Sequence, residues 1–215
     1  MIGYYPALGE LTSVKAELDK LGSLDITPLD TPEPELAYLF KHIVMHEVTY
    51  ESLPFALRAQ LHEQLAAYLE GQIAAGILSE TPLQNLLVHH YTHSDNRDKQ
   101  RVYLLKAGEA ALNVSAFHTA VDYFTRLLDL SSENDPTRAG LALKLADAYF
   151  NLGDFPATRA TIEKARASAQ TGDDRAAALT LLGNTASNLG DYPEAQAILS
   201  EATSQIGRAS CRERV

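Results

Sequence analysis

The sequence is almost free of cysteine. Among its 215 residues only Cys211 is a cysteine, which excludes an intrachain disulfide. Cys211 lies in the last ten residues, IGRASCRERV, where the composition turns abruptly arginine-rich. This string resembles the conceptual translation of a common sequencing adapter. We therefore expect residues 206–215 to be an artefact that ends a fragment of a longer protein; the alternative is a disordered basic terminus.

Basic residues are also scarce. The chain has 18 Lys and Arg against 28 Asp and Glu, a net charge of -10, and no basic block. Clustered Lys and Arg residues bind the phosphates of nucleic acids and the surfaces of anionic membranes. Without such a cluster, we expect neither a nucleic acid nor a membrane as a partner. No apolar run reaches membrane-spanning length, and the start, MIGYYPALGE, lacks the basic and apolar segments of a signal peptide. These absences predict a cytoplasmic protein.

The common motifs of catalysis are missing too. The sequence has no Gly-x-x-x-x-Gly-Lys-Ser/Thr and not one Gly-Lys pair, so it contains no phosphate-binding loop. It also lacks the Gly-x-Ser-x-Gly motif of serine hydrolases. We expect a protein that is not an enzyme and carries no cofactor.

What the sequence does contain is an internal repeat. The stretches NVSAFHTAVDYFTRLL, NLGDFPATRATIEKAR and NLGDYPEAQAILSEAT align, with an aromatic residue at Phe117, Phe155 and Tyr192. The spacings of 38 and 37 residues are close to the about 34-residue helix-turn-helix repeat with a short loop insertion. Gly153 and Gly190 begin Gly-Asp turns, in which glycine ends one helix and aspartate caps the next.

The repeated positions resemble those of tetratricopeptide repeats over roughly residues 98–205. Ser115 stands where glycine is usual, and Thr158 where alanine is typical. The resemblance implies a mainly α fold whose residues 81–205 form an α-solenoid of tetratricopeptide-like helical hairpins. The residues predicted to pack these hairpins are Leu104, Gly108, Phe117, Ala120, Phe124, Ala146, Tyr149, Gly153, Phe155, Leu182, Gly183, Gly190, Tyr192 and Ala195.

Gly183 supports this register. Glycine inside a helix costs about 1 kcal/mol relative to alanine, so its presence predicts a close crossing with the helix that carries Ala195 and Leu199. On this reasoning Gly183→Leu overpacks the crossing, whereas Gly183→Ala is tolerated or stabilising.

Residues 1–80 have a different pattern. We expect an amphipathic helix over 11–23, a β-hairpin near 24–41, and two helices over 42–52 and 54–76, separated by Pro54. This order suggests a winged-helix-like region with a connecting helix, although it is not unique to that fold. The helix over 42–52 contains Glu47 and Glu51 and neither Lys nor Arg, which favours a scaffolding role over DNA binding.

Two groups of histidines raise the question of a metal site. His42 and His46 are one helical turn apart, and His62 follows; a second group is His89, His90 and His93. In the zincin motif a glutamate directly follows the first histidine. Here Glu47 follows His46, the second histidine, so the zincin motif is absent. Because neither group has a further ligand at an evident spacing, we interpret these histidines as packed or solvated and predict no metal.

The segments YLFKHIVMHEVTYESLPFALRAQLHEQLAAYLE and LLVHHYTHSDNRDKQRVYLLKAGEAAL resemble a more specific family. They are similar to the region that follows the ATPase module in bacterial STAND-type signalling ATPases, especially those found with class III adenylate/guanylate cyclase domains. The matching positions are Tyr38, Phe40, His42, Glu47, Val48, Tyr50, Leu53, Arg58, Leu61, His62, Leu69, His89, His90, Tyr91, Leu105, Ala107 and Gly108.

The resemblance implies the domain order nucleotide-binding module, winged helix, tetratricopeptide array, of which this chain holds the last two. It predicts a non-catalytic protein-interaction and sensor segment whose partner is another protein or the ATPase or cyclase domains of the parent chain. The alternative is a small-molecule sensor array that controls the parent ATPase.

Overall fold

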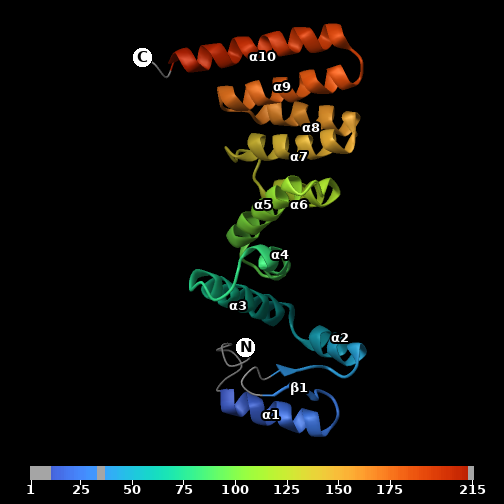
Figure 1. Ribbon diagram of the computed structural model, residues 1–215. Helices are drawn as coiled ribbons and strands as arrows, with labels where there is room; N and C mark the ends of the chain where they lie inside the picture. The colour runs from blue at the N-terminus through green and yellow to red at the C-terminus, as the bar shows by residue number, and fades with distance from the viewer. Residues whose placement is uncertain (1–10, 33–36, 213–215) are drawn as a thin grey trace. The chain divides into compact units, whose positions relative to one another are not determined.

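The computed structural model describes residues 11–32 and 37–212, with side chains for residues 12–32 and 37–205. The described chain is mainly helical with one small antiparallel hairpin, as the sequence predicts (Figure 1). It divides into two compact units, Met1–Arg97 and Asp98–Val215. Helix α4 lies in the first unit, whereas the sequence analysis assigned residues 81–97 to the repeat region.

The first unit combines helices with a two-stranded hairpin. Strands β1 and β2 pair antiparallel, with Leu29 opposite Tyr38 and Thr31 opposite Ala37. The hairpin and the helices that flank it lie where the sequence predicts them; the comparison with a winged helix stays a prediction. The elements are α1 (Leu11–Ser23), β1 (Leu29–Thr31), β2 (Ala37–Tyr38), α2 (Ile43–Ser52), α3 (Phe55–Ala74), the 3-10 helix η3 (Thr81–Leu83) and α4 (Gln84–Thr92).

Helices α3 and α4 pack against each other and form the core of the first unit. Pro54 occupies the N-cap of α3, where a missing N–H costs nothing, and so separates α3 from α2. The buried apolar residues are Ala66, Leu69, Leu87, Val88 and Tyr91. The Tyr91 hydroxyl donates a hydrogen bond to Glu70 (2.6 Å), which ties the two helices together beside this core.

The second unit consists of three helical hairpins, α5–α6, α7–α8 and α9–α10. Helices α7 to α10 lie one above another as a stack in Figure 1. The predicted repeats therefore correspond to one hairpin each. The helices are α5 (Arg97–Asn113), α6 (Phe117–Leu130), α7 (Arg138–Leu152), α8 (Phe155–Ser168), α9 (Gly172–Asn188) and α10 (Tyr192–Arg212).

The turn inside each hairpin needs one residue in the left-handed backbone region. Gly153 (φ 75°) and Gly190 (φ 84°) supply it in the second and third hairpins. Ser115 adopts the same conformation in the first hairpin (φ 59°), although a side chain makes it costly. Asp154 then caps α8 by accepting a hydrogen bond from the Ala157 N–H (3.0 Å).

Small residues fill much of the core of the second unit, so the helices approach closely. Ala146, Ile162, Ala178 and Leu182 form one buried cluster across α7, α8 and α9. Two buried threonines on these helices are satisfied within their own helix. The Thr158 hydroxyl donates to the Asp154 carbonyl (2.8 Å) and the Thr185 hydroxyl to the Leu181 carbonyl (2.7 Å).

The loop between α6 and α7 is fastened to α5 by Asp135. This carboxylate accepts hydrogen bonds from the Thr137 hydroxyl (2.6 Å) and the Thr137 N–H (2.9 Å), and it pairs with the Arg101 guanidinium. These interactions, the Thr137 bonds first, lower the pKa of Asp135 to about 2. The carboxylate is therefore ionised at neutral pH and holds the loop to α5.

Candidate functional site

A groove runs along the first helices of the three hairpins. It has a volume of ≈ 630 Å³. One lining residue comes from α5, three come from α7 and six come from α9. The groove therefore depends on the stacking of consecutive repeats. The lining residues are Leu112, Leu143, Lys144, Asp147, Asp173, Ala176, Ala177, Thr180, Leu181 and Asn184.

The groove repeats with the sequence. Asp147 on α7 and Asn184 on α9 are 37 residues apart, the spacing of the second and third repeats. The equivalent position on α5 is Glu109, which pairs with Lys144 of α7 (3.0 Å). Carboxylate or amide groups thus recur at one position of each first helix, beside the apolar Leu143 and Leu181.

None of the residues predicted from the repeat pattern lines this groove. The structure places most of them between helices: Leu104, Ala120, Phe124, Ala146, Leu182 and Ala195 are buried. The repeat pattern predicts the positions that pack between helices, and the groove residues lie at other positions of the repeat. The same 37-residue spacing, applied to repeat positions that are not predicted to pack, indicates groove residues such as Asp147 and Asn184.

Two of the predicted glycines lie at tight helix crossings. A Cβ atom at Gly108 would lie 2.7 Å from Phe124 Cε1, and one at Gly183 would lie 2.6 Å from Leu199 Cγ. Gly183 therefore faces the helix that the sequence analysis named. This distance argues against the expectation that Gly183→Ala is tolerated or stabilising, because even one methyl group would meet Leu199.

The aromatic residues at the turns do not behave alike. Phe155 packs against Phe150 with ring centroids 5.9 Å apart, and Phe117 is half-buried. Tyr192 is 70% exposed, so its predicted packing role is not observed. The reason is local: the residue equivalent to Phe150 in the third hairpin is Ser187, which offers Tyr192 no aromatic partner.

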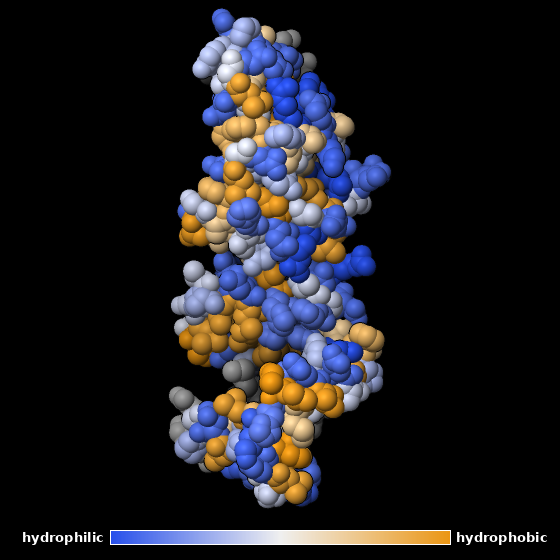
Figure 2. Space-filling model, turned by 90° about the vertical axis from the view of Figure 1, so that its right-hand side faces the viewer, coloured by the Kyte–Doolittle hydropathy of each residue, from blue (hydrophilic) through white to orange (hydrophobic). Residues whose placement is uncertain are grey.

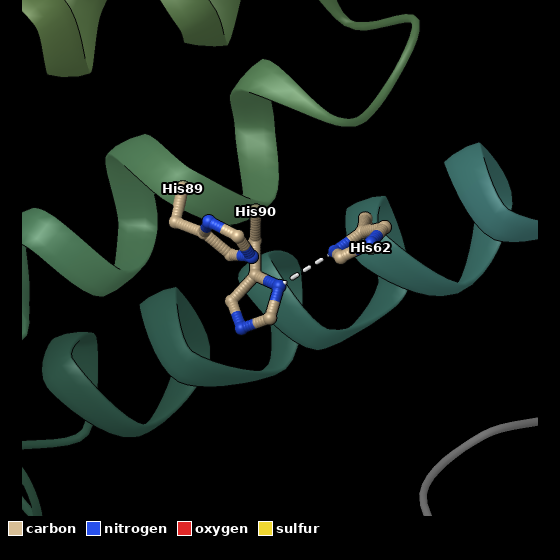
Figure 3. A group of neighbouring side chains, drawn as sticks. All are labelled: His62, His89 and His90. Atoms are coloured by element: carbon tan, nitrogen blue, oxygen red, sulfur yellow. Dashed lines mark hydrogen bonds between the residues drawn. The ribbon is translucent and has the colours of Figure 1, made fainter. Parts of the chain in front are cut away.

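A second feature lies in the first unit, where α3 and α4 bring four histidines together. Potential ligand atoms of His62, on α3, and of His89 and His90, on α4, lie within 4.8 Å of one another (Figure 3). His93, which follows the last turn of α4, has its ring centroid 4.4 Å from that of His89 and 5.1 Å from that of His62.

Hydrogen bonds orient three of these rings. His62 Nδ1 lies 2.8 Å from His90 Nδ1, the bond drawn in Figure 3. His62 Nε2 lies 2.8 Å from the Tyr50 hydroxyl. His93 Nδ1 lies 2.8 Å from the His89 carbonyl oxygen, which can only accept, so His93 Nδ1 carries the proton.

Three of the four histidines, His62, His89 and His90, have lowered pKa values, which favours their neutral forms at neutral pH. Burial, followed by the neighbouring histidines His90, His93 and His89 and then Arg58, lowers the pKa of His62 to about 4. Burial and neighbouring histidines also lower the pKa of His89 and of His90. Neutral imidazole is the form that binds metals.

Sequence spacing alone predicts no further ligand for either of the two histidine groups. The structure joins His62 of one group to His89 and His90 of the other. His46 instead contacts Phe40 and Tyr50 (ring centroids 5.4 and 6.3 Å away), and His42 is the N-cap residue of α2. A separation of 27 residues between His62 and His89 has no sequence signature; the packing of α3 on α4 creates the cluster.

Among the described residues, no helix combines the length and the apolarity needed to cross a bilayer.

Comparisons with known proteins agree with the fold. No curated protein sequence matches the chain. A structure of MamA (MSR-1 C2) shares 16% identity over 78% of this chain and 86% of its own, with a TM-score of 0.50. The structure of BtubC (BKLC) from P. vanneervenii shares 15% identity over 92% of this chain and 82% of its own, with a TM-score of 0.53. The tetratricopeptide repeat family matches residues 137–205, the segment that forms most of hairpins α7–α8 and α9–α10.

Proposed function

We propose that this chain is a non-catalytic protein-interaction segment of a multidomain signalling ATPase or cyclase, and that it acts in the cytoplasm. The observation that carries the proposal is the groove along α5, α7 and α9. It is lined by the first helices of three consecutive hairpins, and its apolar residues Leu143 and Leu181 also pack against the buried cluster of the second unit.

The chemistry of the groove indicates the kind of segment it accepts. Leu112, Leu143 and Leu181 offer apolar contacts, while Asp147 and Asp173 supply negative charge. With a net charge of -10 on the whole chain, a basic segment with several apolar side chains is the complementary partner. The amide of Asn184 can both donate to and accept from the backbone of an extended peptide.

A second observation supports membership of a longer protein. Helix α2 has no buried residue, and Ile43, Val44 and Val48 are each more than 60% exposed. Figure 2 shows hydrophobic residues gathered at the height that α2 occupies in Figure 1. Such a face is expected to be covered by another part of the parent chain, in line with the resemblance to signalling ATPases.

A capture experiment tests the groove. Immobilised wild-type chain is compared with Leu181→Arg, which places a long cation in the groove, and with Lys164→Glu, which changes the charge of an exposed residue on α8. We expect partners that bind the wild type and the control but are lost from Leu181→Arg. Proteins captured equally by all three chains would contradict the proposal.

The alternative function, a small-molecule sensor, is favoured by the volume of the groove, which falls within the roughly 300–1,000 Å³ of ligand pockets. A metabolite screen by thermal shift separates the two. A compound that stabilises the wild type and Lys164→Glu but not Leu181→Arg would favour the sensor.

A further inference from the structure

We propose that His62, His89 and His90, with His93 as a fourth ligand, form a binding site for a divalent transition-metal ion of the zinc class. The site lies wholly within the first unit and joins α3 to α4. It is independent of the groove and of the function proposed for it.

The distances between the nitrogens fit such an ion. Zinc binds imidazole nitrogen at about 2.0–2.1 Å in a tetrahedron, which puts the nitrogens about 3.3 Å apart. The His62 and His90 Nδ1 atoms are 2.8 Å apart, and the ligand atoms of the group of three span no more than 4.8 Å. Small rotations of the rings would therefore separate the His62 and His90 Nδ1 atoms and bring the more distant nitrogens closer together.

Metal binding at His62 Nδ1 would replace the hydrogen bond to His90 Nδ1, while the bonds to Tyr50 and to the His89 carbonyl can remain. When His62 Nδ1 binds the metal, its Nε2–H can donate to the Tyr50 hydroxyl already 2.8 Å away, an arrangement typical of histidine ligands. His93 donates its Nδ1–H to the His89 carbonyl, so its Nε2 lone pair is available. His89 and His93 are four residues apart and lie on one face of the chain at the end of α4.

The ligand type selects the class of metal. All members of the group are imidazoles, which suit zinc, copper and nickel, whereas calcium and magnesium prefer oxygen. One charge opposes binding: Arg58, whose guanidinium stacks on the Phe55 and Tyr50 rings (4.3 and 5.1 Å), acts electrostatically on His62. Arg58→Gln is therefore expected to tighten binding.

Calorimetric titration with Zn²⁺ tests the site, using the full chain purified without a histidine tag and stripped with a chelator. We expect one saturable Zn²⁺ site per chain and no response to Mg²⁺. His62→Gln and His90→Gln should each lower the affinity more than tenfold. Tyr50→Phe, which removes only the partner of His62, should lower it by about 10-fold. The matched control, His118→Gln, alters an exposed histidine on α6 and should leave the affinity unchanged.

A spectroscopic readout and a folding check complete the test. Co²⁺ in place of Zn²⁺ should give the intense visible absorption of a tetrahedral site in the wild type and lose it in His62→Gln. Circular dichroism of the metal-free variants shows whether they are folded; if His62→Gln is not, the exposed His89→Gln takes its place. Absence of saturable Zn²⁺ binding, or equal affinity in folded cluster variants and His118→Gln, would overturn the proposal.

Discussion

Replacing Gly183 with alanine separates two opposing effects of a single methyl group. Alanine is favoured over glycine inside a helix by about 1 kcal/mol. At Gly183, however, the new Cβ would lie 2.6 Å from Leu199 Cγ and 2.7 Å from Leu199 Cδ2. Overpacking of this kind costs roughly 1–3 kcal/mol. We therefore expect Gly183→Ala to lower the free energy of unfolding by about 1 kcal/mol.

The matched control is Gly140→Ala. Gly140 lies in the first turn of α7, and a Cβ there would have Asp174 Oδ1 as its nearest neighbour at 3.9 Å. With ordinary contacts only, the gain in helix propensity should prevail, and Gly140→Ala should stabilise by up to about 1 kcal/mol. The two variants should therefore differ in stability by about 1–2 kcal/mol although the chemical change is the same.

Hydrogen exchange measures the effect where it arises. Solenoid repeats depend on their neighbours, so the loss in Gly183→Ala should appear as lower amide protection in α9 and α10. In a Leu199→Ala background, which removes the clash, Gly183→Ala should become stabilising. If Gly183→Ala raises protection as much as Gly140→Ala does, the crossing at Gly183 is not tight and the reasoning fails.

Three further predictions concern other parts of the chain. Ser115→Gly should raise the melting temperature and stabilise the fold by about 1 kcal/mol, because glycine adopts the left-handed backbone conformation without the steric cost of a side chain. An unchanged or lower melting temperature would contradict this. The lowered pKa of Asp135 means that its stabilisation is present above pH 4 and lost as the pH falls through about 2. Between pH 5 and pH 2 the melting temperature of Asp135→Asn should therefore fall less steeply than that of the wild type. Equal slopes for the two proteins would refute this stabilising role of Asp135. The purified chain should not hydrolyse ATP, since it has no phosphate-binding loop; saturable turnover in a phosphate-release assay would refute this.

Sequence reasoning reached the helical hairpins because their signals are local and periodic. The turn glycines Gly153 and Gly190 and the small residues recur at nearly fixed spacing, and each has one physical reason. The exposure of Tyr192 was missed because it depends on the residue opposite, Ser187, and not on the repeat position itself. The clearance at Gly183 depends on fractions of an ångström in the position of Leu199, which no pattern encodes.

The histidine cluster was missed for a different reason. Its members come from two helices, α3 and α4, and each group alone has an ordinary structural explanation. Only the packing of the two helices places His62 beside His90. Sites of this kind become visible when candidate ligands from separate elements are compared in space.

Two of the buried threonines of the second unit bear on how such arrays change length. Thr158 and Thr185 each satisfy their hydroxyl within their own helix and require no acceptor from the neighbouring hairpin. A gene duplication that adds one hairpin, or a deletion that removes one, would therefore leave neither hydroxyl without a partner. Steric fit at positions such as Gly183 would remain the main requirement for the new junction. At these two positions, a change in repeat number would therefore break no buried hydrogen bond.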